Sequence, residues 1–213
     1  MELEKLVEIF IFTHASFGGI ALLTGAIALI ARKGNKVHRK SGKIFFYSML
    51  TSALLAFVIS VLPNHESPFL FSIGVFSTYF LISGYRSLAF RQKEIELKWD
   101  KVIAYIISIT GLVMILYPLI IYAKLNIVLA IFGTVGLVFG IRDLILFKNV
   151  ERVKKNWLKL HLGKMTGGYI SAVSAFFVVN QILAGFWNWF VPGIIGGGYI
   201  TYWMFKIAKK ARS

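Results

Sequence analysis

Residues 102–123 read VIAYIISITGLVMILYPLIIYA and contain no charged side chain. As a helix, this stretch would rise about 33 Å, because each residue adds about 1.5 Å. The hydrocarbon core of a bilayer is about 30 Å thick. Lys101 and Lys124 flank the stretch, where the polar headgroups would begin. The pattern therefore predicts a transmembrane helix.

Six further apolar runs of similar length repeat this pattern. The composition agrees, since 57% of the residues are apolar and 15% charged, against roughly 45–50% and 25% in soluble domains. The connections are too short for a soluble unit, which predicts an all-α, polytopic transmembrane bundle forming a single domain over residues 1–213. The seven predicted helices occupy residues 7–31, 44–62, 69–90, 102–123, 126–147, 161–184 and 188–207.

Lysine and arginine are distributed unevenly between the two sides of this bundle. One side receives Lys5 and Lys124, and the other receives the remaining 22 of the 24 basic residues. Basic segments stay in the cytoplasm. We therefore expect the N-terminus outside, the C-terminus in the cytoplasm, and a multi-pass location in the inner (plasma) membrane. The net charge of +15 then indicates contact with membrane lipid and not with nucleic acid, because no separate basic domain exists.

Several of the predicted helices, the first and the fifth among them, carry stripes of small residues at spacings of three and four, which keep them on one helix face. Small residues allow helix backbones to approach closely in lipid. These stripes therefore predict packing faces. They comprise His14, Gly18, Ala21, Gly25, Ala28 and Arg32 in the first helix, and Gly133, Gly136, Gly140 and Asp143 in the fifth.

His14 is a candidate ligand-binding residue in the outer half of the membrane. It lies about 9 Å deeper than Glu8 at the helical rise, and ionisable groups at such depth are functional candidates by default. Asn180 lies at a comparable depth. The alternative is that a neutral imidazole simply donates a hydrogen bond to a neighbouring helix.

Polar residues are more crowded on the basic side. The cationic groups could hold an anionic head group, a phosphate or a propionate, or they could pair with one another and with lipid. His38, His161 and Asp100 could ligate a divalent metal, although no local spacing motif supports this. The candidate ligand-binding residues of this side are His38, Arg39, Arg86, Arg142 and Lys164.

Several longer motifs resemble those of a family of small bacterial multi-spanning membrane proteins of unknown function. They are HASFGGIALLTGAIAL (14–29), HRKSGK (38–43), HLGKM (161–165) and SAFFVVN (174–180). Tyr79 in the third helix also fits the pattern and is a candidate ligand-binding residue. The resemblance implies an architecture and candidate positions, without an established activity. These positions are His14, His38, Arg39, Arg86, His161 and Asn180.

Two functional classes fit these observations. The first is a membrane protein that binds, and transports or senses, a small or amphipathic ligand. The alternative is a haem- or metal-binding redox protein that uses histidines of the cytoplasmic side. Haem between helices takes histidines from two helices at similar depth, which His38 and His161 satisfy and His14 with His161 do not. The sequence contains neither an HExxH nor a GxSxG motif, the patterns that would indicate a zinc or a serine hydrolase.

Overall fold

The protein consists of helices joined by short connections. The computed structural model describes residues 2–210, apart from the side chains of residues 2, 3, 69 and 210, and contains no strand within that range. The helices are α1 (Glu2–Ile30), α2 (Lys36–Ile59), α3 (Pro68–Arg86), the 3-10 helix η1 (Ser87–Arg91), α4 (Lys98–Tyr122), α5 (Ile127–Leu146), α6 (Val150–Asn180) and α7 (Trp187–Lys210).

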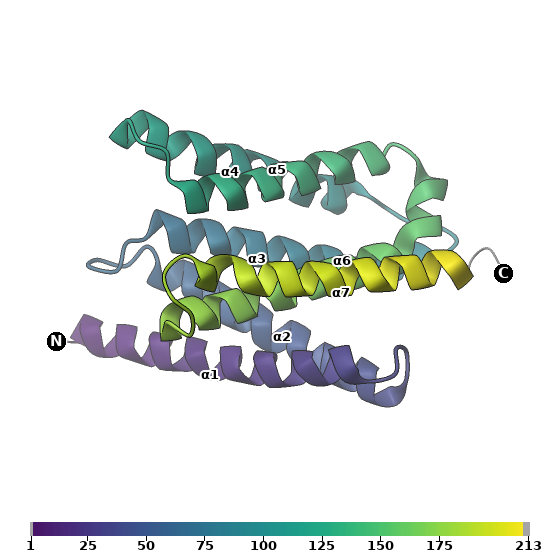
Figure 1. Ribbon diagram of the computed structural model, residues 1–213, viewed down its shortest axis with the longest axis horizontal. Coiled ribbons are helices and arrows are strands. Elements are labelled where there is room, and N and C mark those ends of the chain that lie inside the picture. The colour runs from purple at the N-terminus through teal and green to yellow at the C-terminus, as the bar shows by residue number, and fades with distance from the viewer. Residues whose placement is uncertain (1, 211–213) are drawn as a thin grey trace.

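The seven α-helices of this range lie side by side in one bundle (Figure 1). α1 pairs with α2 along one edge and α4 pairs with α5 along the other, while α3, α6 and α7 lie between these pairs. α1 begins at one end of the bundle and α7 ends at the opposite end. The all-α fold with seven helices, predicted from the apolar runs, is confirmed.

Five of these helices are long and apolar enough to cross a membrane, namely α1, α2, α4, α5 and α6. α3 and α7 lie outside this group, but their 19 and 24 residues rise about 28 and 36 Å. Large apolar side chains such as Phe12, Ile30 and Ile120 are exposed, as expected for a lipid-facing surface. The chain is therefore a multi-spanning membrane protein, and its orientation stays a prediction.

α2 begins earlier than its apolar run does. Residues 32–43 were expected to form a loop, but the helix starts at Lys36, so that His38 and Arg39 lie in its first turn. Asn35 is the N-cap, and its side-chain oxygen accepts a hydrogen bond from the backbone N–H of His38 at 2.8 Å. An Asn cap stabilises a helix start whatever the hydropathy of the residues that follow.

α6 differs most from its prediction. It begins at Val150 and not at residue 161, with Asn149 accepting a hydrogen bond from the N–H of Arg152 at 3.0 Å. It ends at Asn180, before Gln181, which has a left-handed backbone with φ of 48°. Hydropathy marks the part of a helix that lies in lipid, whereas this helix continues as a polar segment beyond it. In Figure 1 its first turns run across the end of the bundle from α5 toward α3.

The small-residue stripe of α5 packs against α4 at very short range. Gly133, Gly136, Gly140 and Asp143 are all buried, as predicted. A Cβ atom built on Gly111 of α4 would lie 2.5 Å from the carbonyl oxygen of Gly133. The two backbones therefore touch, and only glycine fits at this crossing.

Candidate functional site

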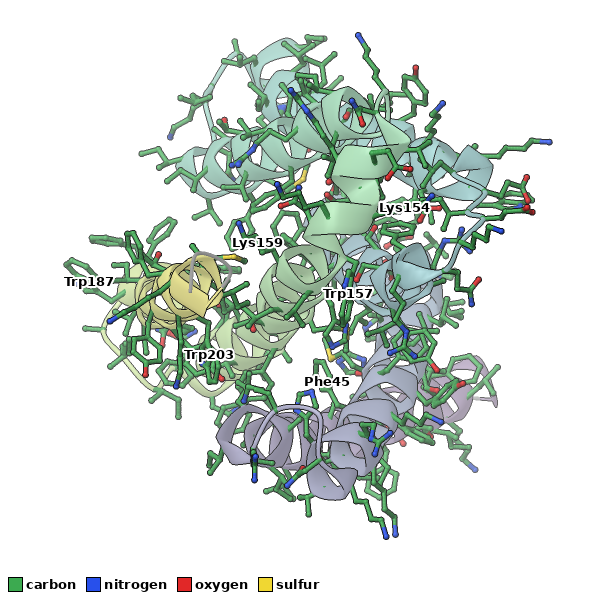
Figure 2. All side chains as sticks on the ribbon, turned by 90° about the vertical axis from the view of Figure 1, so that its right-hand side faces the viewer. Phe45, Lys154, Trp157, Lys159, Trp187 and Trp203 are labelled. Atoms are coloured by element: carbon green, nitrogen blue, oxygen red, sulfur yellow. The ribbon has the colours of Figure 1, made fainter. Side chains whose placement is uncertain are left out.

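A well-formed cavity lies at the end of the bundle where α1 ends and α2 begins. It has a volume of about 440 Å³ and lies between α1, α2 and α6, with further walls from α3, η1 and α7. We call it the basic-end cavity. Figure 2 views the molecule from this end and shows Phe45 and Trp157 beside the space between α6 and the α1–α2 pair. Its aromatic lining residues are Phe45, Tyr85, Trp157, Tyr169 and Tyr199.

Cationic side chains surround this cavity, and none of its described lining residues is acidic. The cations are Lys33, Arg39, Lys43 and Arg91. Lys33 donates to the carbonyl of Leu29 and lies 5.1 Å from the ring centre of Trp203 on α7. Arg91 lies 5.9 Å from the ring centre of Trp157. An apolar space with an uncompensated positive rim favours a molecule that has an apolar body and a negative group.

Two histidines line the same cavity from opposite helices. The Nδ1–H of His38 donates to the carbonyl oxygen of Ala28 at 2.9 Å, and the Nδ1–H of His161 donates to that of Gly84 at 2.8 Å. A carbonyl oxygen only accepts, so in each ring the proton sits on Nδ1. The Nε2 atom of the neutral ring then carries the lone pair and can bind a proton donor or a metal.

The third predicted metal ligand lies elsewhere. Asp100 on α4 is buried and bound to Arg86, whose Nε and Nη2 donate to its two carboxylate oxygens at 2.9 and 2.7 Å. Among residues 2–210, no three His, Asp or Glu side chains come close enough together to hold a metal ion. The structure therefore does not bring Asp100 together with His38 and His161.

Tyr79 and Lys164, two predicted ligand-binding residues, belong to a buried cluster outside the cavity lining. Lys164 forms an ion pair with Asp143 of α5, and Tyr79 of α3 donates to the same carboxylate oxygen at 2.7 Å. Nζ of Lys164 also donates to the hydroxyl oxygen of Tyr79 at 3.1 Å. The exposed fractions of Tyr79, Asp143 and Lys164 are 2%, 4% and 4%. This cluster joins three helices and leaves these groups no open side toward the basic-end cavity.

Arg142 and Asp143 are neighbours in α5 but lie in different surroundings. The sequence reasoning selected Arg142 as a binding residue, but its side chain is exposed while that of Asp143 is buried in the ion pair. The signal was present, because Asp143 continues the stripe of Gly133, Gly136 and Gly140 toward the bundle interior.

In the predicted outer half, His14 binds α2 and not a cavity. Its Nδ1–H donates to the carbonyl oxygen of Ser52 at 2.8 Å, and the Ser52 hydroxyl donates to the carbonyl of His14 at 3.0 Å. This is the cross-helix hydrogen bond weighed as the alternative for His14. Asn180 is exposed and donates to Phe176 of its own helix at 2.8 Å.

The structure thus gathers His38, Arg39 and His161 at one cavity and separates them from the other candidates. Sequence reasoning missed the aromatic side chains and the basic residues Lys33, Lys43 and Arg91 that complete the cavity. Aromatic and basic residues recur near the predicted cytoplasmic ends of several helices, which was the available signal. It could not show which of them share one space.

Comparison with known proteins adds one finding. No curated protein and no solved structure matches the chain. The model of one family, described as predicted membrane protein (DUF2306), matches residues 11–141, which is more than half of the chain and extends from α1 into α5. The match includes His38 and Arg39 but ends before His161. The chain therefore belongs to the DUF2306 family of predicted membrane proteins.

Proposed function

We propose that this membrane protein binds a small amphipathic anion in the basic-end cavity, with the apolar part inside and the anionic group at the rim. The observation that carries the proposal is the cavity itself. About 440 Å³ of space has aromatic and aliphatic walls, four cationic side chains and no acidic residue among its described lining. Sites for small molecules have volumes of roughly 300–1,000 Å³ and mostly apolar walls.

Carboxylate and phosphate are the anionic groups that suit this rim. Arg39 and Arg91 carry planar guanidinium groups, which bind both anions through pairs of parallel hydrogen bonds. Apolar surroundings weaken competition from water and strengthen such contacts. A neutral ligand of the same shape would leave the four cations without an anionic partner and would bind less well.

The positive-inside distribution supports a cavity that opens toward the cytoplasm in an inner-membrane protein. A ligand can then enter either from the cytoplasm or along the headgroups of the inner leaflet. Transport or sensing would each begin with this binding step. The redox alternative places one particular occupant, a haem, in the same cavity and requires no second site.

The test compares native mass spectra of three proteins purified in mild detergent. The wild type should carry a co-purified molecule of defined mass and negative charge. Gly42→Phe should lose it, because Gly42 lines the cavity and a Cβ built there meets no atom within 4 Å. Gly198→Phe is the matched control, since Gly198 also faces open space but lies on α7 outside the cavity lining. A wild type without adduct, or an adduct that survives in Gly42→Phe, would contradict the proposal.

A further inference from the structure

We propose that the occupant of the basic-end cavity is a planar, carboxylate-bearing metal chelate of the haem class, with its iron bound by Nε2 of His38 and Nε2 of His161. This inference rests on the proposed function, because it names the ligand of the same cavity. It involves two coordination bonds from neutral imidazoles and needs no proton transfer and no oxidant.

The hydrogen bonds of the two histidines are the first argument. The rings come from different helices, α2 and α6, and line the same space. Each ring is held by a hydrogen bond to a neighbouring helix. Nδ1 of His38 donates to the carbonyl oxygen of Ala28 on α1, and Nδ1 of His161 donates to that of Gly84 on α3. Histidines that bind metals are held in this way, with the second ring N–H donated to a carbonyl or carboxylate oxygen. The arrangement fixes the tautomer that an iron ligand needs.

The number of ligands is the second argument. A divalent metal bound by the protein alone needs at least three side chains, and residues 2–210 hold no such group. Two histidines are the complete protein contribution when the other four ligands of an octahedral iron come from a porphyrin. The site therefore fits a chelated metal better than a bare metal ion.

The shape and charge of the cavity are the third argument. Gly42 forms part of the α1–α2 wall one turn after His38, and a Cβ built there meets no atom within 4 Å, which leaves room for a flat molecule beside His38. A Cβ on Gly25 would collide with the ring of Tyr169, so this wall also carries an aromatic side chain. Arg39 and Arg91 can bind the carboxylates of such a chelate.

Reconstitution with hemin tests the inference. Purified wild type titrated with hemin should reach one equivalent and give the Soret and visible bands of six-coordinate, low-spin, bis-histidine iron. His38→Ala and His161→Ala should each lose these bands and bind hemin more than about tenfold more weakly, since even supporting groups cost 10–100-fold at metal sites. His14→Ala and His65→Ala are matched controls that should behave as wild type, because neither residue lines the cavity.

Two further measurements separate coordination from loss of structure. Added imidazole should restore the low-spin spectrum of His161→Gly, which a general defect in folding would not allow. Unaltered spectra in both cavity variants would overturn the assignment of the axial ligands. If the wild type carries a co-purified anion that Gly42→Phe loses, yet shows no histidine-dependent hemin spectrum, then the haem inference fails while the proposed function stands.

Discussion

Asp143→Asn removes the anion from the buried cluster of Tyr79, Asp143 and Lys164 while it keeps the shape of the side chain. In the structure the carboxylate receives Lys164 and the hydroxyl of Tyr79 at one oxygen. An amide in the same place can still accept from Tyr79. It cannot neutralise the ammonium group of Lys164, which is 4% exposed.

The expected cost follows from this burial. Removing one partner of a buried ion pair leaves an uncompensated charge and typically destabilises a protein by about 3–5 kcal/mol. Arg142→Gln is the matched control on the same helix, because Arg142 is exposed. Exposed substitutions of this kind change stability by about 0.5 kcal/mol or less.

The assay is the free energy of unfolding in mixed micelles at increasing mole fractions of denaturing detergent. A third variant, Asp143→Leu combined with Lys164→Met, removes both charges and should be more stable than Asp143→Asn, since an apolar replacement of a buried pair is often neutral or stabilising. If Asp143→Asn and Arg142→Gln unfold alike, the ion pair does not hold α5 to α6 and the reasoning is refuted.

Three other predictions concern packing, the outer histidine and topology. Gly111→Ala should destabilise the protein by about 1–3 kcal/mol, because its Cβ would lie 2.5 Å from a carbonyl oxygen of α5. The control Gly197→Ala, whose Cβ meets no atom within 4 Å, should cost far less, and equal midpoints of thermal unfolding for the two variants would contradict this. His14→Ala should cost about 1–3 kcal/mol by the same assay and His65→Ala almost nothing; equal tolerance removes the role of His14. The chain has no cysteine, so one introduced within residues 31–35 should react with an impermeant maleimide in inverted vesicles and not in intact cells; the reverse pattern refutes the orientation.

The helices themselves could be predicted because lipid imposes one strong requirement, about 20 apolar residues per crossing. Where a helix extends beyond the lipid, its end is determined by capping hydrogen bonds and not by hydropathy. The first turn of α2 and the first turns of α6 depend on the caps Asn35 and Asn149, which hydropathy does not register. The correction at α2 matters for the proposed site, because it places His38 on a helix and not in a loop.

The candidate site could be predicted only in part. His38, Arg39 and His161 were selected because basic and imidazole side chains crowd on the predicted cytoplasmic side, where they could hold an anionic group or a metal. Sequence does not say which groups face each other, since that depends on how α1, α2 and α6 pack. Lys164 shows the difficulty, because it lies only three residues after His161 yet points to Asp143 and away from the cavity.

A crystal structure of the protein purified in mild detergent, without removal of co-purified molecules, tests the central claim most directly. The account predicts density for one molecule inside the basic-end cavity, with an anionic group within hydrogen-bonding distance of Arg39 or Arg91. A cavity closed by side chains, or a co-purified molecule bound at another place on the bundle, would contradict it.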